Sequence, residues 1–207
     1  PARPGPPGRR PPGRARALPV LPVLASLALP AAACGPAEEP GPPTIRIETG
    51  AEAGPLLQAL LDTLRGPVRV VLTPGRYVLE PTPYTDPTCG NCEDPSETVP
   101  ATRGLRLTGS GITLEGDAAR PAEVTIETRA GYGVLFDRCS DCALRGVTVT
   151  GGIRDEDGRA TDAAVVVRGG PVTVERCAIF DNRGDSAAVH SVVVGVAGIA
   201  VREDADL

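Results

Sequence analysis

Short runs of alternating apolar and polar residues recur along the chain at intervals of about thirty residues. Three segments align, beginning at Gly104, Gly133 and Ala164, so that the offsets between them are 29 and 31 residues. Each segment has two alternating runs joined by a turn rich in Gly, Ser, Asp or Pro, and a third run follows after a bend. Such short alternation predicts β-strands, because successive side chains of a strand point to opposite faces.

Equivalent positions of the three segments hold apolar side chains or cysteine. This pattern predicts parallel strands wound round one axis, because each residue then lies about 4.8 Å above its counterpart in the preceding turn. Charged residues at outward positions predict two columns of alternating sign, one with Glu115, Arg145 and Glu175 and one with Asp137 and Arg168. The predicted internal columns contain Leu105, Leu107, Ile112, Leu114, Val124, Ile126, Val134, Phe136, Cys142, Leu144, Val147, Val149, Val165, Val167, Val172, Val174, Cys177 and Ile179.

The segment before the first repeat predicts a cover for the open end of such a stack. Alternation indicates a strand over 44–49, and leucines at helical spacing indicate a helix over 53–66, so that residues 44–66 form an N-terminal capping unit. A strand over 68–72 follows, and a turn over 73–77 closes it.

The order of these motifs resembles that of a known fold family. A helix, then VRVVLTPGRY, GITLEG and repeated GV…VTVTGG, resembles the N-terminal part of pectin-lyase-like, right-handed parallel β-helix repeat proteins, over about residues 44–185. The resemblance implies an all-β fold: a right-handed parallel β-helix (solenoid) over 67–207 with an N-terminal capping α-helix. Because such proteins usually have more coils, we expect this chain to be a fragment lacking C-terminal coils. Families of this fold include polysaccharide lyases, glycoside hydrolases, epimerases and surface proteins, so the resemblance indicates a fold and no single activity.

The first 33 residues have the features of an export signal peptide. A basic start is followed by an apolar run over 17–30 and by three alanines, which are small residues before a cleavage point. The run is too short for a membrane-spanning helix. The sequence AAAC resembles the lipobox of bacterial lipoproteins, which implies a lipid on Cys34 and a Pro-rich tether over 34–43. We therefore expect an exported protein, anchored through lipid alone to the bacterial outer membrane or cell surface; the alternative is an ordinary cleaved signal and a secreted protein.

Charge is spread unevenly along the chain. All 26 acidic residues follow position 34, whereas five of the 21 arginines precede it and no lysine is present. Cleavage before Cys34 would leave 16 arginines against the 26 acidic residues, a formal charge of −10. A protein this acidic repels phosphate backbones and attracts divalent cations, so we expect no nucleic-acid partner.

Four of the remaining cysteines form two C-x-x-C pairs. Cys89 and Cys92 lie in a Cys- and Pro-rich insertion, residues 81–102, whereas Cys139 and Cys142 lie in the second repeat. Disulfides are favoured because the exterior of the cell is oxidising, although reduced thiols and a four-thiolate zinc site remain alternatives. The sequence does not indicate which cysteines pair.

Two polar clusters are candidates for chemistry. The loop 151–162 places Asp155, Asp157 and Asp162 around a glycine, as in calcium-binding turns, although it lacks the spacing of an EF-hand and also suits a solvated acidic turn. The sequence FDNRGD places Asp181, Arg183 and Asp185 together as weak catalytic candidates, because paired carboxylates serve acid–base chemistry in polysaccharide-active β-helices. The alternative there is a polar turn with Asn182 in a left-handed conformation. The single histidine, His190, fits no catalytic spacing.

These features favour a binding protein over an enzyme. We expect a lipid-anchored β-helix that presents a surface to glycan or another cell-envelope component, with no cofactor other than calcium. The alternative is a polysaccharide lyase or glycoside hydrolase whose active site lies in coils beyond this sequence. A calcium-stabilised, adhesin-like spacer is the third hypothesis.

Overall fold

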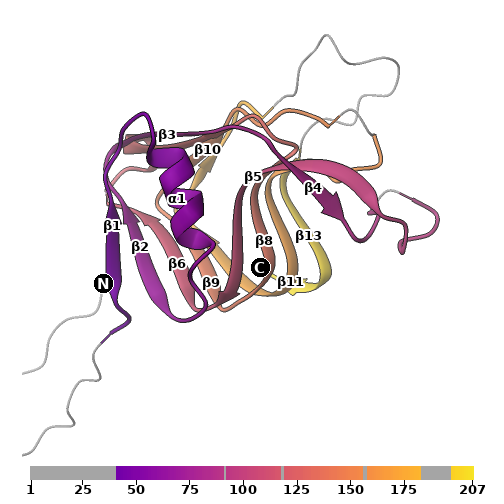
Figure 1. Cartoon of the computed structure of the whole chain (residues 1–207), viewed down its shortest axis with the longest axis horizontal. Coiled ribbons are helices and arrows are strands. Elements are labelled where there is room, and N and C mark those ends of the chain that lie inside the picture. The colour runs from indigo at the N-terminus through magenta and orange to yellow at the C-terminus, as the bar shows by residue number, and fades with distance from the viewer. Residues whose placement is uncertain (1–40, 91, 118, 156–157, 183–196) are drawn as a thin grey trace, which may run out of the picture. The chain divides into compact units, whose positions relative to one another are not determined.

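The protein has an all-β fold with one α-helix, as the sequence predicts (Figure 1). The computed structural model describes residues 41–90, 92–117, 119–155, 158–182 and 197–207. The strands are β1 Thr44–Ile47, β2 Val68–Leu72, β3 Gly75–Leu79, β4 Thr82–Asp86, β5 Val99–Ser110, β6 Ile112–Gly116, β7 Val124–Thr128, β8 Tyr132–Ser140, β9 Cys142–Arg145, β10 Thr148–Thr150, β11 Ala163–Glu175, β12 Ala178–Ile179 and β13 Ala197–Asp206. The helix α1 spans Ala53–Leu61, and a short 3₁₀ turn spans Pro121–Glu123.

The strands form two sheets. One has nine strands in the order β1-β2-β6-β9-β11-β8-β5-β4, with β13 also paired to β11, and the other has the order β12-β10-β7-β3. The first half of β11 pairs with β8 and the second half with β9, so the larger sheet has two arms joined through β11. Gly169 and Gly170, with φ of +62° and +97°, lie between the two halves, where a residue with a Cβ would be strained. The first two runs of this repeat are therefore parts of one continuous strand.

The predicted alignment of equivalent residues is confirmed by the strand register. Leu105 lies opposite Val134, and Val134 lies opposite Val165, in parallel pairs. All three side chains are fully buried in one hydrophobic core. The second and third runs align in the same way, through Leu114, Leu144 and Val174 and through Ile126, Val149 and Ile179. Each run therefore contributes a column of side chains to the core.

One of the two charge columns lies at the surface as predicted, and the other does not. Glu115, Arg145 and Glu175 lie opposite one another on neighbouring strands and are partly exposed. Asp137 and Arg168 also lie opposite one another, but both are buried, with 3% and 2% of their surface exposed. The prediction that this second pair faces solvent is wrong, because the insertion and β13 cover it, as described below.

The N-terminal elements differ from the predicted ones in two places. Residues 75–79 form the strand β3, which pairs with β7, and not the closing turn that the sequence predicts. Tyr77 consequently faces the core and donates a hydrogen bond from its hydroxyl to the Ile47 carbonyl at 2.8 Å. The helix ends at Leu61 and not near Gly66, and Leu56 is 61% exposed, so it lies outside the apolar face of the helix.

The helix α1 covers an open strand edge. It packs against β3 and β5, and Leu57 and Leu61 are buried in the main core. The Gln58 side-chain amide donates to the Arg106 carbonyl at 3.2 Å and accepts from the Arg106 N–H at 2.8 Å. One side chain thus supplies the two hydrogen bonds that a neighbouring strand would make to this residue of β5.

The insertion forms a hairpin that covers the outer face of β8 and β11. Its strand β4 pairs antiparallel with Val99–Arg103, the first part of β5 (Figure 1). A second hydrophobic cluster lies beneath it, separate from the main core. Its buried members are Cys89, Val99, Ala101, Tyr132, Leu135, Ala160, Ala163 and Val166. Both faces of this arm are therefore buried, and the polar residues on its outer face need partners.

We predict that Gln58→Ala lowers the free energy of unfolding by about 1–3 kcal/mol, because the Arg106 N–H and carbonyl lose their partners in a partly buried position. Urea denaturation measures the change. Leu56→Ala, in the same helix but exposed, should change the free energy by no more than about 0.5 kcal/mol. Equal effects of the two substitutions would show that Gln58 does not protect the strand edge.

Candidate functional site

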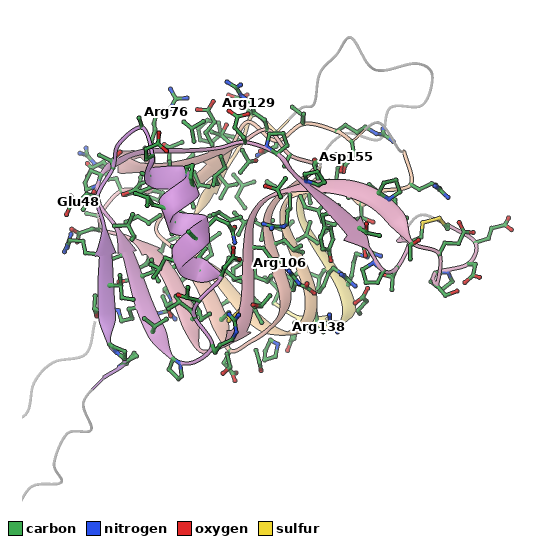
Figure 2. All side chains as sticks on the ribbon, viewed as in Figure 1. Glu48, Arg76, Arg106, Arg129, Arg138 and Asp155 are labelled. Carbon is green, nitrogen blue, oxygen red and sulfur yellow. A yellow bond between two sulfur atoms is a disulfide. The ribbon has the colours of Figure 1, made fainter. Side chains whose placement is uncertain are left out.

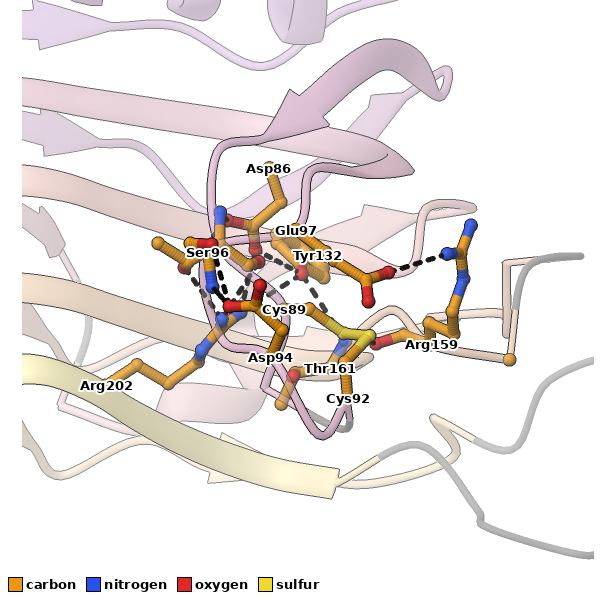
Figure 3. Close-up of a disulfide and its surroundings, with 12 residues drawn as sticks. Asp86, Cys89, Cys92, Asp94, Ser96, Glu97, Tyr132, Arg159, Thr161 and Arg202 are labelled. Carbon is orange, nitrogen blue, oxygen red and sulfur yellow. Dashed lines mark hydrogen bonds and ion pairs between the residues drawn. A yellow bond between two sulfur atoms is a disulfide. The ribbon is translucent and has the colours of Figure 1, made fainter.

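A network of buried charges lies under the hairpin, on the outer face of β8 and β11. Asp86, at the end of β4, is fully buried and accepts hydrogen bonds from the Tyr132 hydroxyl at 2.6 Å and from Arg202 at 2.7 Å (Figure 3). Arg202 also donates to the carbonyl and the hydroxyl of Thr88. Strand β13 is thereby joined to the hairpin, about 115 residues earlier in the chain.

Arg168 lies at the centre of this network. Its guanidinium donates to both carboxylate oxygens of Glu203, at 2.7 and 2.8 Å, and hydrogen-bonds the Tyr84 hydroxyl. It also lies 3.5 Å from Asp86 and 3.8 Å from Asp137. Burial alone would lower the pKa of Arg168, but the hydrogen bonds to Glu203 and the charge of Asp86 outweigh burial and raise it.

Glu203 reaches Arg168 because of an irregularity in β13. The register of β11 and β13 shifts between Arg168 and Gly170, and Glu203 has a φ of +57°. Such a bulge redirects a side chain that would otherwise point elsewhere. Arg106 joins the network through a hydrogen bond to Asp137 at 3.0 Å.

The properties of this network indicate a structural role and not a catalytic one. Its charged members balance in sign: Arg106, Arg168 and Arg202 with Asp86, Asp137 and Glu203. Burial, followed by the hydrogen bond to Asp86, raises the pKa of Tyr132, so its hydroxyl stays protonated. Removing one partner of a buried ion pair costs about 3–5 kcal/mol, so the network opposes any placement of the hairpin that leaves a charge unpaired.

The C-x-x-C cysteines pair within each motif. Cys89 and Cys92 form one disulfide, and Cys139 and Cys142 form the other. In each pair, two residues lie between the cysteines. The first closes the hairpin loop, where Cys89 contacts the Arg159 carbonyl (Figure 3). The second is buried in the main core. Cys177 is a free thiol whose pKa is raised by burial.

Two carboxylates of the predicted calcium loop converge beside the hairpin. Asp155 accepts hydrogen bonds from the main-chain N–H of Thr102 at 2.8 Å and from its hydroxyl at 2.6 Å. The Asp155 N–H donates to Asp162 Oδ2 at 3.1 Å. A Cβ at Gly131 would lie 2.3 Å from Asp155 Oδ2 and 2.4 Å from Asp162 Oδ1, so both oxygens lie over this glycine. Only a residue without a side chain fits beneath the pair.

The environment of this pair favours a protonated Asp162. Burial, and secondly the charge of Asp155, raise the pKa of Asp162 from 3.8 to about 7. Asp162 is 8% exposed, and its Oδ1 is buried without a hydrogen-bond partner. Two carboxylates this close cannot both be ionised without a compensating positive charge.

An open pocket of about 620 Å³ adjoins the pair. It lies between the hairpin and the residues that follow β10, and Asp155 and Arg129 both line it (Figure 2). Its wall combines two arginines, one carboxylate and an apolar surface with two prolines. The lining residues are Pro81, Pro100, Ala101, Thr102, Arg129, Ile153, Arg154 and Asp155. Arg129 is 59% exposed at its side chain, and the carboxylate of Glu80 lies 3.9 Å away.

The other predicted site residues lie apart from this pocket or outside the described residues. Asp181 does not line it and has a φ of +53°, so the left-handed residue of that turn is Asp181 and not Asn182 as expected. Asn182 instead accepts a hydrogen bond from the Gly152 N–H and donates one to the Val149 carbonyl, which joins this turn to the end of β10. Five of the predicted residues and the predicted signal peptide, residues 1–33, lie outside the described residues; the five are Cys34, Asp157, Arg183, Asp185 and His190.

Sequence reasoning missed Arg129, Thr102 and the prolines of the pocket. They come from the end of β7 and from the hairpin, and no local pattern indicates that these segments meet. Within the described ranges, His, Cys, Asp and Glu do not gather in groups of three suited to a metal ion. No described helix is long and apolar enough to span a membrane.

Comparison with known proteins gives no assignment: no family model, curated protein or solved structure matches the chain.

We predict that stability depends on pH through Asp162. Because its pKa is higher in the folded state than the ordinary 3.8, the folded protein binds this proton more tightly than the unfolded chain does. The free energy of unfolding should therefore fall as the pH rises from about 4 to about 7, and this contribution should change no further above that range. Asp162→Asn should remove this dependence, since its amide N–H can donate to Asp155 as the protonated carboxyl does.

Urea unfolding at several pH values, in the presence of a chelator, measures the slope. The exposed Asp141→Asn is the matched control and should keep the slope of the unaltered protein. An unchanged slope in Asp162→Asn would contradict the assignment.

Proposed function

We propose that this chain is an exported, lipid-anchored right-handed parallel β-helix that binds an acidic glycan of the cell envelope without catalysing a reaction. The fold part of the proposal is supported by parallel pairing between strands one repeat apart and by in-register apolar columns. The β4–β5 pair is the only antiparallel pair among the described strands, and it belongs to the insertion.

The pocket is the observation that supports glycan binding. Arg129 and Arg154 offer planar, charged donors that match carboxylate groups, and Asp155 lies beside them as an acceptor for hydroxyl groups. Pro81 and Pro100 add rigid apolar surface suited to the C–H faces of a sugar ring. A chain of uronic acids offers a carboxylate, hydroxyl groups and an apolar ring face in each residue, so it is the ligand class that we propose.

Binding is favoured over hydrolysis because the carboxylate pair does not open to the pocket as a catalytic pair would. Asp155 lines the pocket, but Asp162 does not, and Asp162 is 8% exposed. A general acid must reach the proton acceptor on the substrate within hydrogen-bonding distance. Asp155 is also held by two hydrogen bonds to Thr102, which suits a fixed binding group.

Export and anchoring are proposed from the sequence of the first 34 residues. The basic start, the short apolar run and AAAC favour a lipoprotein signal with a lipid on Cys34. Two disulfides support an oxidising location, because disulfides are rare in the reducing cytosol.

We predict that the protein binds uronic-acid oligosaccharides more tightly than neutral ones of equal length. Arg129→Ala and Arg154→Ala should each weaken binding by a factor of about 10 to 100, because a hydrogen bond to a charged group is worth about 1.5–3 kcal/mol. Isothermal titration calorimetry with an oligogalacturonate and an oligoalginate measures the dissociation constants.

Arg120→Ala is the matched control, since this exposed arginine does not line the pocket. It should leave the affinity unchanged. Binding that is equal in all three variants, or equally tight for neutral oligosaccharides, would overturn the proposed site.

We predict that Cys34→Ser abolishes lipid labelling and membrane association when the full chain is expressed in a bacterium that processes lipoproteins. Labelling with a radioactive fatty acid, followed by membrane fractionation, measures both. Cys177→Ser, which alters the other cysteine outside the two disulfides, should retain the label. A label that persists in Cys34→Ser would exclude this anchor.

A further inference from the structure

A second pocket lies where the chain passes from the larger sheet to the smaller one. It has a volume of about 380 Å³ and is lined by residues of β2, β6 and β9 and of the segments that follow β6, β9 and β11. Its charged lining residues are Arg69, Glu115, Arg145 and Arg176, and we call it the arginine pocket. It shares no described residue with the pocket beside Asp155, so the two are separate sites.

The lining of the arginine pocket is positive, although the chain as a whole has a formal charge of −5. Among the described lining residues, three arginines are present against the one carboxylate of Glu115, which gives a formal charge of +2. Like charges gathered at one pocket repel one another, and an anion bound among them removes that repulsion. The charge of the lining therefore favours an anionic ligand.

The carboxylates nearby leave hydrogen-bond donors of these arginines unused. Glu115 forms an ion pair with Arg69, whereas the single oxygen Oε1 of Glu175 lies 3.3 Å from Arg145 and 3.5 Å from Arg176. The Nε of Arg145 is buried and has no hydrogen-bond partner, so its contact with Glu175 is an ion pair alone. Each guanidinium has five N–H donors, and these two carboxylates do not satisfy all of them.

The third arginine occupies a backbone position that favours glycine. Arg145 and Glu175 lie opposite one another, so the residues that follow them, Gly146 and Arg176, are equivalent. Both have left-handed backbones, with φ of +59° for Gly146 and +53° for Arg176. A residue with a side chain is disfavoured in this conformation. The third repeat thus adds a guanidinium to the pocket at a place where the second repeat has no side chain.

We propose that the arginine pocket binds one phosphate group, either free or carried on a sugar, through Arg69, Arg145 and Arg176. A guanidinium matches two oxygens of a phosphate with parallel hydrogen bonds. A tetrahedral phosphate presents oxygens in several directions, so it can accept from arginines that come from three segments of the chain. A nucleic-acid strand would extend beyond the pocket, where the acidic chain repels it. The site does not depend on the glycan proposal.

Isothermal titration calorimetry of the full chain, with inorganic phosphate and with glucose 6-phosphate, tests this site at about pH 8, where the phosphate is doubly charged. Binding should saturate at one phosphate per chain. Arg69→Ala and Arg176→Ala should each weaken it at least about tenfold, because each removes charged donors. Glu175→Gln should strengthen it, since this change frees Arg145 and Arg176 from their shared carboxylate.

Arg138→Ala is the matched control for Arg176→Ala. Arg138 also has a left-handed backbone, with φ of +51°, and the two side chains are 78% and 79% exposed. Each lies beside an acidic neighbour, but Arg138 does not line the arginine pocket. Its replacement should leave phosphate affinity unchanged, and so should Arg129→Ala in the other pocket. Far-UV circular dichroism shows whether each variant is folded.

The two probes distinguish the sources of the phosphate. Tighter binding of glucose 6-phosphate would support a sugar phosphate as the ligand, and equal affinity would support the free ion. Failure of both probes to saturate the chain would overturn the proposal. An equal loss of affinity in Arg138→Ala and Arg176→Ala would show diffuse attraction to surface arginines and would overturn it as well.

Discussion

The structure depends on main-chain hydrogen bonding between parallel strands that lie one repeat apart. Strands of one sequence repeat pair with the equivalent strands of the repeats before and after it, so equivalent residues lie in register. Such stacking buries Leu105, Val134 and Val165 without any large aromatic core, which a chain with 2% aromatic residues cannot build. Part of β5 has a neighbouring strand on one side only, because β4 pairs with residues 99–103 alone. The Gln58 side chain satisfies one such position on β5.

The insertion buries the outer face of one arm of the larger sheet, formed by β8 and the first half of β11. Without the hairpin, the outer face of β8 and β11 would be solvated, and its charges would form a surface column. With the hairpin in place, Asp137 and Arg168 are buried, and their charges are matched by Glu203, Asp86 and Arg106. The buried network and the second apolar cluster together fix the position of the hairpin. The pocket exists because this position brings the hairpin beside the residues after β10.

The pocket and the carboxylate pair have one residue in common, Asp155. It lines the pocket, is held by Thr102 and donates its N–H to Asp162. A ligand in the pocket would therefore contact a residue that is hydrogen-bonded to Asp162. Because Thr102 of the hairpin holds Asp155 and hairpin residues line the pocket, the position of the hairpin decides the geometry of both the pocket and the carboxylate pair.

The sequence by itself determined the strands of the three repeats, the spacing of about thirty residues between them and the alignment of their inward residues. Apolar alternation along each strand is a local pattern, and it fixes which face of the strand is buried. It also indicated that Asp155 and Asp162 belong to one acidic loop. Only the tertiary structure decided that residues 75–79 form the strand β3, that Arg168 is buried and that Thr102 and Arg129 line one pocket with Asp155. The strand β3 depends on pairing with β7, about fifty residues later in the chain. The other two outcomes depend on where the insertion folds back, which contacts with distant strands decide and no local pattern in the sequence indicates.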